Sequence, residues 1–154
     1  MEFDNYGHLV PYDIIDTDLA AFERIFVTDF THSSTRSGIF EAYLNYLSDL
    51  KQIIGGGFYQ WIDGSFTTLK RNPNDIDLVT FIDFGIYQRY EKQLEEVRKI
   101  RFRRGNKIDG YFVKCYPETH HQRQLFEFDR LQWQFDFGRS FVNKREKGII
   151  QINF

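Results

Sequence analysis

Two short groups of residues between positions 61 and 81 have the types and spacing that phosphate and metal chemistry require. Gly64 and Ser65 come first, and two acids, Asp75 and Asp77, follow at the start of an apolar run. A glycine lets backbone N–H groups approach a phosphate closely, and a serine hydroxyl adds a donor that can rotate. Because side chains alternate along a strand, the two acids point to the same face. The stretch therefore predicts a phosphate-binding turn beside a pair of carboxylates.

Repulsion between the two carboxylates indicates what binds between them. It raises the pKa of at least one of the acids unless a positive charge lies nearby. Mg²⁺ prefers hard oxygen ligands, so we expect Asp75 and Asp77 to hold Mg²⁺ or Mn²⁺. Lys70, between the two groups, would add a point charge for a phosphate, although a lysine in a loop is usually only solvated.

The same residues also have a purely structural interpretation. Gly64-Ser65 and the segment 72–74 would be ordinary turns, and the two acids would form the polar face of a half-exposed strand. The acids open the most hydrophobic run of the chain, however, where an exposed strand would favour Thr, Lys or Gln. This placement favours the functional interpretation.

The stretch resembles the signature of the nucleotidyltransferase superfamily related to DNA polymerase beta. That signature is an apolar residue, Gly, Gly or Ser, a spacer, and then Asp, an apolar residue, Asp or Glu, and an apolar residue. The matching residues are Ile62, Gly64, Ser65, Asp75, Ile76, Asp77 and Leu78. Asp63 departs from the pattern, which more often has an apolar or small residue before the glycine.

A wider resemblance covers most of the chain. It is to a family of short bacterial nucleotidyltransferase-like proteins without an assigned function. The segments that carry it are the phenylalanine-rich N-terminal helices and residues 61–68, 72–77, 108–113, 116–118 and 147–152. The resemblance implies an α+β protein with a minimal nucleotidyltransferase fold, in which helices flank a small mixed sheet.

The superfamily resemblance also implies a third carboxylate on a later strand, which ligates the catalytic metal and helps to deprotonate the acceptor hydroxyl. We favour Asp109, because it opens an apolar strand directly after a long helix and shares a face with Tyr111. Asp136 is the rival, although its neighbours are more typical of an amphipathic helix. The implied catalytic and metal residues are thus Asp75, Asp77 and Asp109, with Gly64, Ser65 and Lys70 at the phosphates.

Three function classes follow from this resemblance. The first is a metal-dependent enzyme that transfers a nucleoside monophosphate from an NTP, with ATP preferred, to a hydroxyl of a macromolecular acceptor, protein or RNA. The second is a catalytically inactive binding module of the same fold, such as an antitoxin or an assembly subunit. The third, a small-molecule modifier of the aminoglycoside type, is disfavoured because no second domain to hold a small acceptor is evident. The intact acids favour the first class.

Composition agrees with one domain over residues 1–154, with a mainly helical part at 1–57 and a sheet-containing catalytic part at 58–154. The net charge of −2 argues against bulk nucleic-acid binding, although six cations gather between residues 98 and 107. They can meet a phosphate, RNA or an acidic partner, or simply end a solvated helix. Neither a signal peptide nor a membrane span is evident, so we expect a cytoplasmic protein.

Periodicity predicts the elements that position these residues. Apolar residues at helical spacing predict helices from about 19 to 30 and from about 40 to the Gly55-Gly57 run. Strands are expected at 58–63, 76–82, 108–116 and 148–154, with a single helix between 87 and 105. The segment 127–137 is ambiguous between helix and strand.

Overall fold

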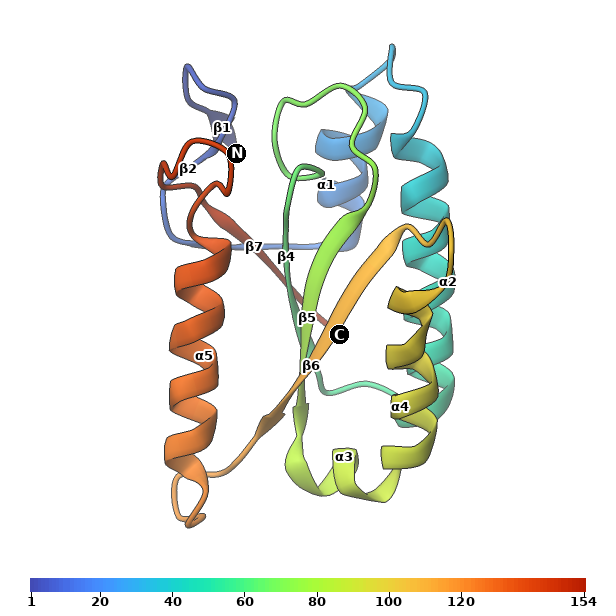
Figure 1. Ribbon diagram of the computed structural model, residues 1–154, viewed down its shortest axis with the longest axis vertical. Coiled ribbons are helices and arrows are strands. Elements are labelled where there is room, and N and C mark those ends of the chain that lie inside the picture. The colour runs from blue at the N-terminus through green and yellow to red at the C-terminus, as the bar shows by residue number, and fades with distance from the viewer.

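A five-stranded mixed sheet organises the computed structural model, which describes residues 1–154 (Figure 1). The strand order is β3-β7-β4-β5-β6. The strands are β3 Ile14–Thr17, β7 Ile149–Asn153, β4 Tyr59–Asp63, β5 Ile76–Asp83 and β6 Ile108–Cys115. β5 and β6 are parallel, as are β3 and β7, whereas β4 runs antiparallel to both of its neighbours.

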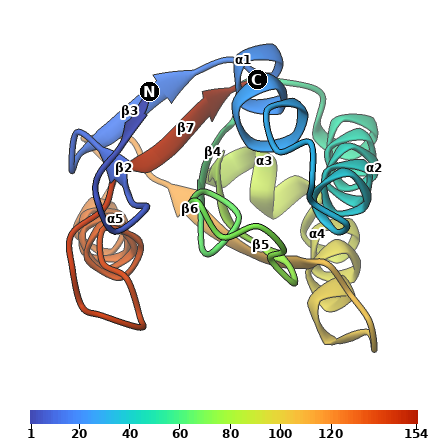
Figure 2. The ribbon, with the colours of Figure 1, turned by 90° about the horizontal axis from the view of Figure 1, so that it is seen from above.

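Helices cover the two faces of this sheet unequally. One face carries a core of 21 buried residues beneath four helical segments. These are α1 Leu19–Glu23, its π-helical continuation Arg24–Thr28, α2 Arg36–Ile54 and α4 Glu91–Arg98. The other face carries α5, Arg123–Phe137, over a second cluster of seven buried residues that includes Phe81. Figure 2 shows α5 across the sheet from α2 and α4.

Both layers follow from the alternation of side chains along the strands. In β5, Ile76, Leu78 and Ile82 belong to the larger core, whereas Val79 and Phe81 belong to the cluster under α5. Both faces of β5 are therefore apolar, which explains its nearly continuous hydrophobic run. Asp77 is the polar exception on the α5 face.

A small antiparallel ladder at the N-terminus packs against one end of the sheet. Its strands are β1 Glu2–Phe3 and β2 Leu9–Val10. The N–H of Leu69 donates to the Gly7 carbonyl at 3.0 Å, and the N–H of Gly148 donates to the Leu9 carbonyl at 2.8 Å. The ladder thus joins two loops that are far apart in sequence.

The expected α+β arrangement and mixed sheet are confirmed, and α2 ends at Gly55, whose φ of 75° suits a glycine. The segment 127–137 lies within the helix α5. The expected single helix after β5 is instead three segments: α3 Phe84–Arg89, α4, and a 3-10 turn at Lys99–Phe102. It breaks at Tyr90, which leaves the helical conformation (φ −112°, ψ 19°).

Residues 2–17 also differ from the expectation of a mainly helical N-terminal part. They form β1, β2 and β3, and β3 joins the main sheet through β7. Strands of two to four residues are shorter than the span over which period-2 alternation can be recognised. None of the helices combines the length and the apolar composition that crossing a membrane requires.

Candidate functional site

Three adjacent strands carry an aspartate at the same level of the sheet. Asp63 at the end of β4 pairs with Asp77 in β5, and Asp77 pairs with Asp109 in β6. Directly paired residues of neighbouring strands project to the same face. The three carboxylates therefore form a row on the α5 face of the sheet, and Asp75 lies two residues before Asp77, at the entrance to β5.

Asp77 is at the centre of this row and has the most unusual electrostatic environment. Its pKa is raised to about 6, most strongly by burial and then by the negative charges of Asp75 and Asp109, whereas Lys147 opposes the shift. Ionised Asp77 thus lacks sufficient compensating positive charge in the protein alone. A bound cation would supply that charge.

The turn after β4 packs directly on the Asp77 carboxylate. Gly64 has a φ of +82°, and a Cβ atom built on it would lie 1.7 Å from Asp77 Oδ2. Only a glycine permits this approach. Gly64 and Ser65 also line the cavity described below, so the backbone of this turn borders both Asp77 and that cavity.

A cavity of about 450 Å³ lies between this turn and the loop after α5. Gly64, Ser65, Lys70 and Asp77 all line it, so four of the six residues predicted for the site share one cavity. The other lining residues are Tyr6, His8, Thr68, Ser140, Phe141, Val142, Asn143 and Lys147. Asp75 and Asp109 are not among the lining residues, although their charges act on Asp77.

Arg36 holds the loop that contains the turn. It is fully buried, and its guanidinium donates at 2.7–2.8 Å to the carbonyls of Phe26, Phe66, Thr68 and Lys70. The Phe30 ring lies 3.7 Å from the guanidinium carbon. Burial lowers the Arg36 pKa to about 10, which leaves the side chain cationic at neutral pH. Arg36 therefore ties the loop to α2 and to the N-terminal helix.

A buried ion pair supports the same turn from the other side. Lys147 Nζ lies 2.7 Å from Asp63 Oδ2, and both side chains are only 6% exposed. Lys147 also donates to the Gly64 carbonyl at 3.5 Å. Burial raises the pKa of Asp63, and the Lys147 ammonium offsets part of that shift. Asp63, which departs from the nucleotidyltransferase signature, is thus the structural partner of Lys147.

Asp109 has both carboxylate oxygens engaged by its neighbours. Arg101 Nη2 lies 3.1 Å from Oδ1, and the Tyr111 hydroxyl donates to Oδ2 at 3.3 Å. Arg101 also donates to the Tyr111 hydroxyl and stacks over the Tyr111 ring at 3.6 Å. Asp136, the rival candidate, is exposed on α5 and accepts a hydrogen bond from Gln132. Strand register thus puts Asp109, and not Asp136, beside Asp77.

The residues at this site fit a divalent ion only when other ligands join them. No three His, Cys, Asp or Glu side chains of the structure form a metal-binding group. Mg²⁺, however, is commonly held by one or two carboxylates together with water and the phosphates of a substrate. Asp75 and Asp77, beside the Gly64-Ser65 turn, suit that mode of binding.

Sequence reasoning missed three residues that build the site. Arg36 and Lys147 contact the turn across long sequence separations, and no local pattern marks either residue. Arg101 was expected only as one cation of a basic cluster, whereas it is the partner of Asp109. Lys147 opens the last segment of the wider resemblance, which was its only sequence signal.

No curated protein and no solved structure matches the chain. A family model does match, over residues 1–153, and it is described as a family of unknown function. Because the match spans nearly the whole chain, the protein belongs to that family, DUF6932.

Proposed function

We propose that this protein has a minimal nucleotidyltransferase fold and transfers a nucleoside monophosphate from an NTP, with ATP preferred, to a hydroxyl of a macromolecular acceptor. The observation that carries the proposal is the contact of the Gly64 turn with Asp77. It brings a glycine-serine turn, whose backbone and hydroxyl suit phosphate oxygens, next to a carboxylate whose ionised form lacks sufficient positive charge around it.

Each residue of the site would have a distinct role. The turn at Gly64-Ser65 would bind the β- and γ-phosphates, and Lys70 at the rim of the cavity would add a positive charge. Asp75 and Asp77 would hold Mg²⁺ together with the phosphates. The bound ion would neutralise charge on the phosphates and on the leaving pyrophosphate.

The reaction would be a substitution at the α-phosphorus. The acceptor hydroxyl oxygen would form a bond to the α-phosphorus, and the bond from that phosphorus to the oxygen bridging to the β-phosphate would break, which releases pyrophosphate. The hydroxyl proton would pass to Asp109 once this carboxylate is free of Arg101.

The ion pair of Asp109 also favours a second candidate function. Because Arg101 and Tyr111 occupy both Asp109 oxygens, a protein that kept this arrangement would bind nucleotide without transferring it. Such a binding module could serve as an antitoxin or an assembly subunit. The two functions share the nucleotide site and differ in the fate of Asp109.

Nucleotide binding and transfer can be tested separately. Calorimetric titration of each NTP with Mg²⁺ should show binding to the wild type and its loss in Asp77→Ala, while Asp136→Ala serves as an exposed control. Equal binding by wild type and Asp77→Ala would overturn the proposal. Incubation with host lysate should then transfer label from α-³²P-NTP, but not from γ-³²P-NTP, to an acceptor that keeps it after denaturation. Binding without transfer would favour the binding module.

A further inference from the structure

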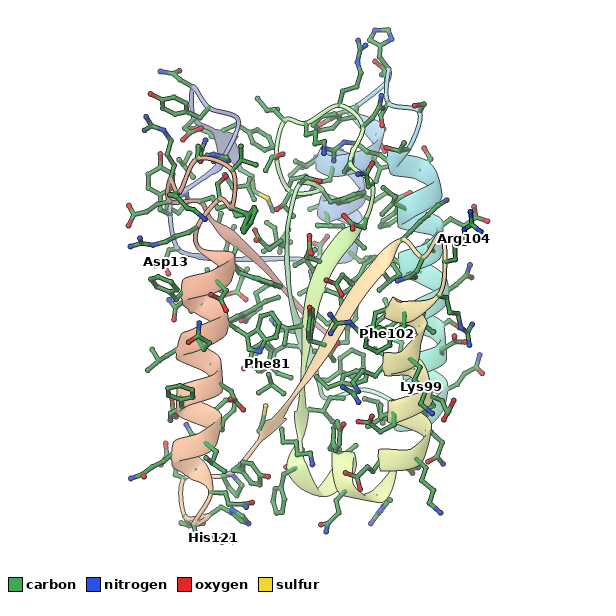
Figure 3. The ribbon with its side chains drawn as sticks, in the orientation of Figure 1. Asp13, Phe81, Lys99, Phe102, Arg104 and His121 are labelled. Atoms are coloured by element: carbon green, nitrogen blue, oxygen red, sulfur yellow. The ribbon has the colours of Figure 1, made fainter.

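The segment that joins α4 to β6 concentrates positive charge beside the proposed site. Its cations are Arg98, Lys99, Arg101, Arg103, Arg104 and Lys107. Figure 3 shows Lys99, Phe102 and Arg104 along this segment, on the side of the molecule that carries α2 and α4. The segment leads directly into β6, and the Ile76 N–H donates to the Lys107 carbonyl at 3.0 Å. It therefore adjoins the entrance to β5, where Asp75 and Asp77 lie.

Some of these charges have partners and others have none. Arg98 and Lys99 pair with Glu95 and Glu96 of α4, respectively. Arg103 and Arg104 are exposed and form no ion pair with the rest of the chain. The two arginines next to β6 thus remain available to an external anion.

An exposed aromatic ring lies among these cations. Phe102 is 72% exposed, with the Arg101 guanidinium 5.3 Å from the centre of its ring. Arginines around an exposed ring are the combination with which proteins bind single-stranded nucleic acid, because the bases stack on the ring while the cations contact phosphates. An acidic polypeptide would use the charges but would leave the ring without a stacking partner.

Arg101 links this surface to Asp109. Its side chain is 19% exposed, and its guanidinium pairs with Asp109 at 3.1 Å. A phosphate at the segment would compete with Asp109 for the same guanidinium. Binding of a polyanion would therefore release the carboxylate that the transfer reaction needs.

We propose that residues 98–107 bind a single-stranded polynucleotide whose terminal hydroxyl is the acceptor, and that its phosphate takes Arg101 away from Asp109. The identity of the acceptor rests on the proposed nucleotidyl transfer, whereas binding of the polynucleotide does not. In the free protein Asp109 is held by Arg101, so that acceptor binding and release of the base are one event.

Binding is tested first, by fluorescence anisotropy with a labelled 12-nucleotide single-stranded RNA and with DNA of the same sequence. Arg103→Ala with Arg104→Ala should weaken binding and make the salt dependence shallower by about 1.4 in log–log slope, the expectation for two lost contacts. Phe102→Ala should weaken binding roughly fivefold or more with little change in slope. Arg89→Ala with Lys92→Ala removes two exposed cations elsewhere and is the matched control.

Three results would overturn the binding site. The first is equal RNA affinity of the wild type and the Arg103/Arg104 variant. The second is a loss of affinity in the Arg89/Lys92 control as large as in the Arg103/Arg104 variant. The third is displacement of the labelled RNA by polyglutamate as effectively as by unlabelled RNA. The last result would indicate an acidic protein partner. Comparison of RNA with DNA shows which sugar is preferred.

The competition for Arg101 is tested by a double-mutant cycle that needs no catalysis. Asp109→Asn should tighten RNA binding severalfold because it frees Arg101, and this gain should be much smaller when Arg101→Ala is also present. An equal gain in both backgrounds would mean that Asp109 acts only through its charge, and the competition would be wrong. Failure of nucleotidyl transfer in the wild type would leave these binding results unaffected, so the two proposals fail separately.

Discussion

At the scale of single residues, Asp77 combines a cost to stability with a proposed function. Its folded-state pKa of about 6 lies above the value of 3.8 for an unperturbed aspartate. The folded protein therefore binds its proton more tightly than the unfolded chain does, and this residue lowers stability as the pH rises from about 4 to 6. Above that window, ionised Asp77 remains an uncompensated charge.

Asp77→Asn should therefore stabilise the metal-free protein at neutral pH. We expect an increase of about 1–2 kcal/mol in the free energy of unfolding at pH 7.5, because Asn carries no charge, and about a third of that increase at pH 4.5, where folded Asp77 is largely protonated. Urea unfolding at the two pH values measures this. Asp136→Asn, on an exposed helix surface, should show no such dependence. A variant less stable than the wild type at pH 7.5 would contradict the prediction.

The structure changes what a substitution of Gly64 can test. From the sequence, a bulky substitution there is expected to block triphosphate binding in a protein that still folds. The positive φ and the lack of room for a Cβ atom, which would lie 1.7 Å from Asp77 Oδ2, make the residue a structural requirement. Gly64→Ala should cost about 2 kcal/mol or more, and loss of binding alone would not identify a phosphate site.

Thermal unfolding of Gly64→Ala followed by circular dichroism tests this expectation. Gly55→Ala is a suitable comparison, since Gly55 has a similar φ of +75° but a Cβ atom added there would meet nothing within 4 Å. The Gly64 variant should lose clearly more stability than the Gly55 variant. Equal losses would mean that the backbone conformation, and not the contact with Asp77, sets the cost.

At the scale of elements, the buried pair of Lys147 and Asp63 joins the loop before β7 to the end of β4. Lys147→Met should destabilise the protein by about 3–5 kcal/mol, because it leaves a buried carboxylate without its counter-charge. Adding Asp63→Asn should restore much of this loss. Urea unfolding of the single and double variants gives the coupling.

A matched control comes from an exposed ion pair. Lys99 and Glu96 lie 2.6 Å apart with side chains 60% and 71% exposed. Lys99→Met should cost less than about 1 kcal/mol. Comparable losses for Lys147→Met and Lys99→Met would show that burial does not determine the value of the pair.

Helix α5 is apolar on both of its faces. Phe126 and Phe137 are buried against the sheet, whereas Leu125, Phe128, Leu131 and Phe135 are 55–67% exposed. Phe137→Ala should cost about 3–5 kcal/mol, and Leu131→Ser should change stability by less than about 0.5 kcal/mol. Chemical denaturation distinguishes the faces. A large loss in Leu131→Ser would mean that the outer face is covered in solution.

The elements that the sequence predicted well are those with a long local pattern. β5, α2 and β6 have periodic apolar residues or clear terminating glycines, and their boundaries agree within a few residues. The start of α5, which has no side-chain cap, and the break at Tyr90 carry no local sequence signal and were not predicted.

At the scale of the whole molecule, part of the site follows from sequence and part does not. Gly64, Ser65 and Asp77 were predicted together from one local signature, and they do lie together because β5 returns antiparallel beside β4. Other walls come from segments that no local pattern connects with the turn: Tyr6 and His8 near the N-terminus, and residues 140–143 with Lys147 from the loop after α5.

The arrangement of the cavity walls predicts how hydrogen exchange changes when a nucleotide binds. Since the cavity is lined by three segments that are remote in sequence, a bound nucleotide should protect all three from hydrogen exchange together. Mass spectrometry with saturating Mg²⁺ and nucleotide should show slower exchange at 4–9, 64–70 and 138–147, with no change on the outer part of α4. Asp77→Asn under the same conditions should show none of this protection. Protection confined to 64–70 would mean that the ligand contacts the turn without entering the cavity, and the proposed binding site would then have to move to the open side of β5.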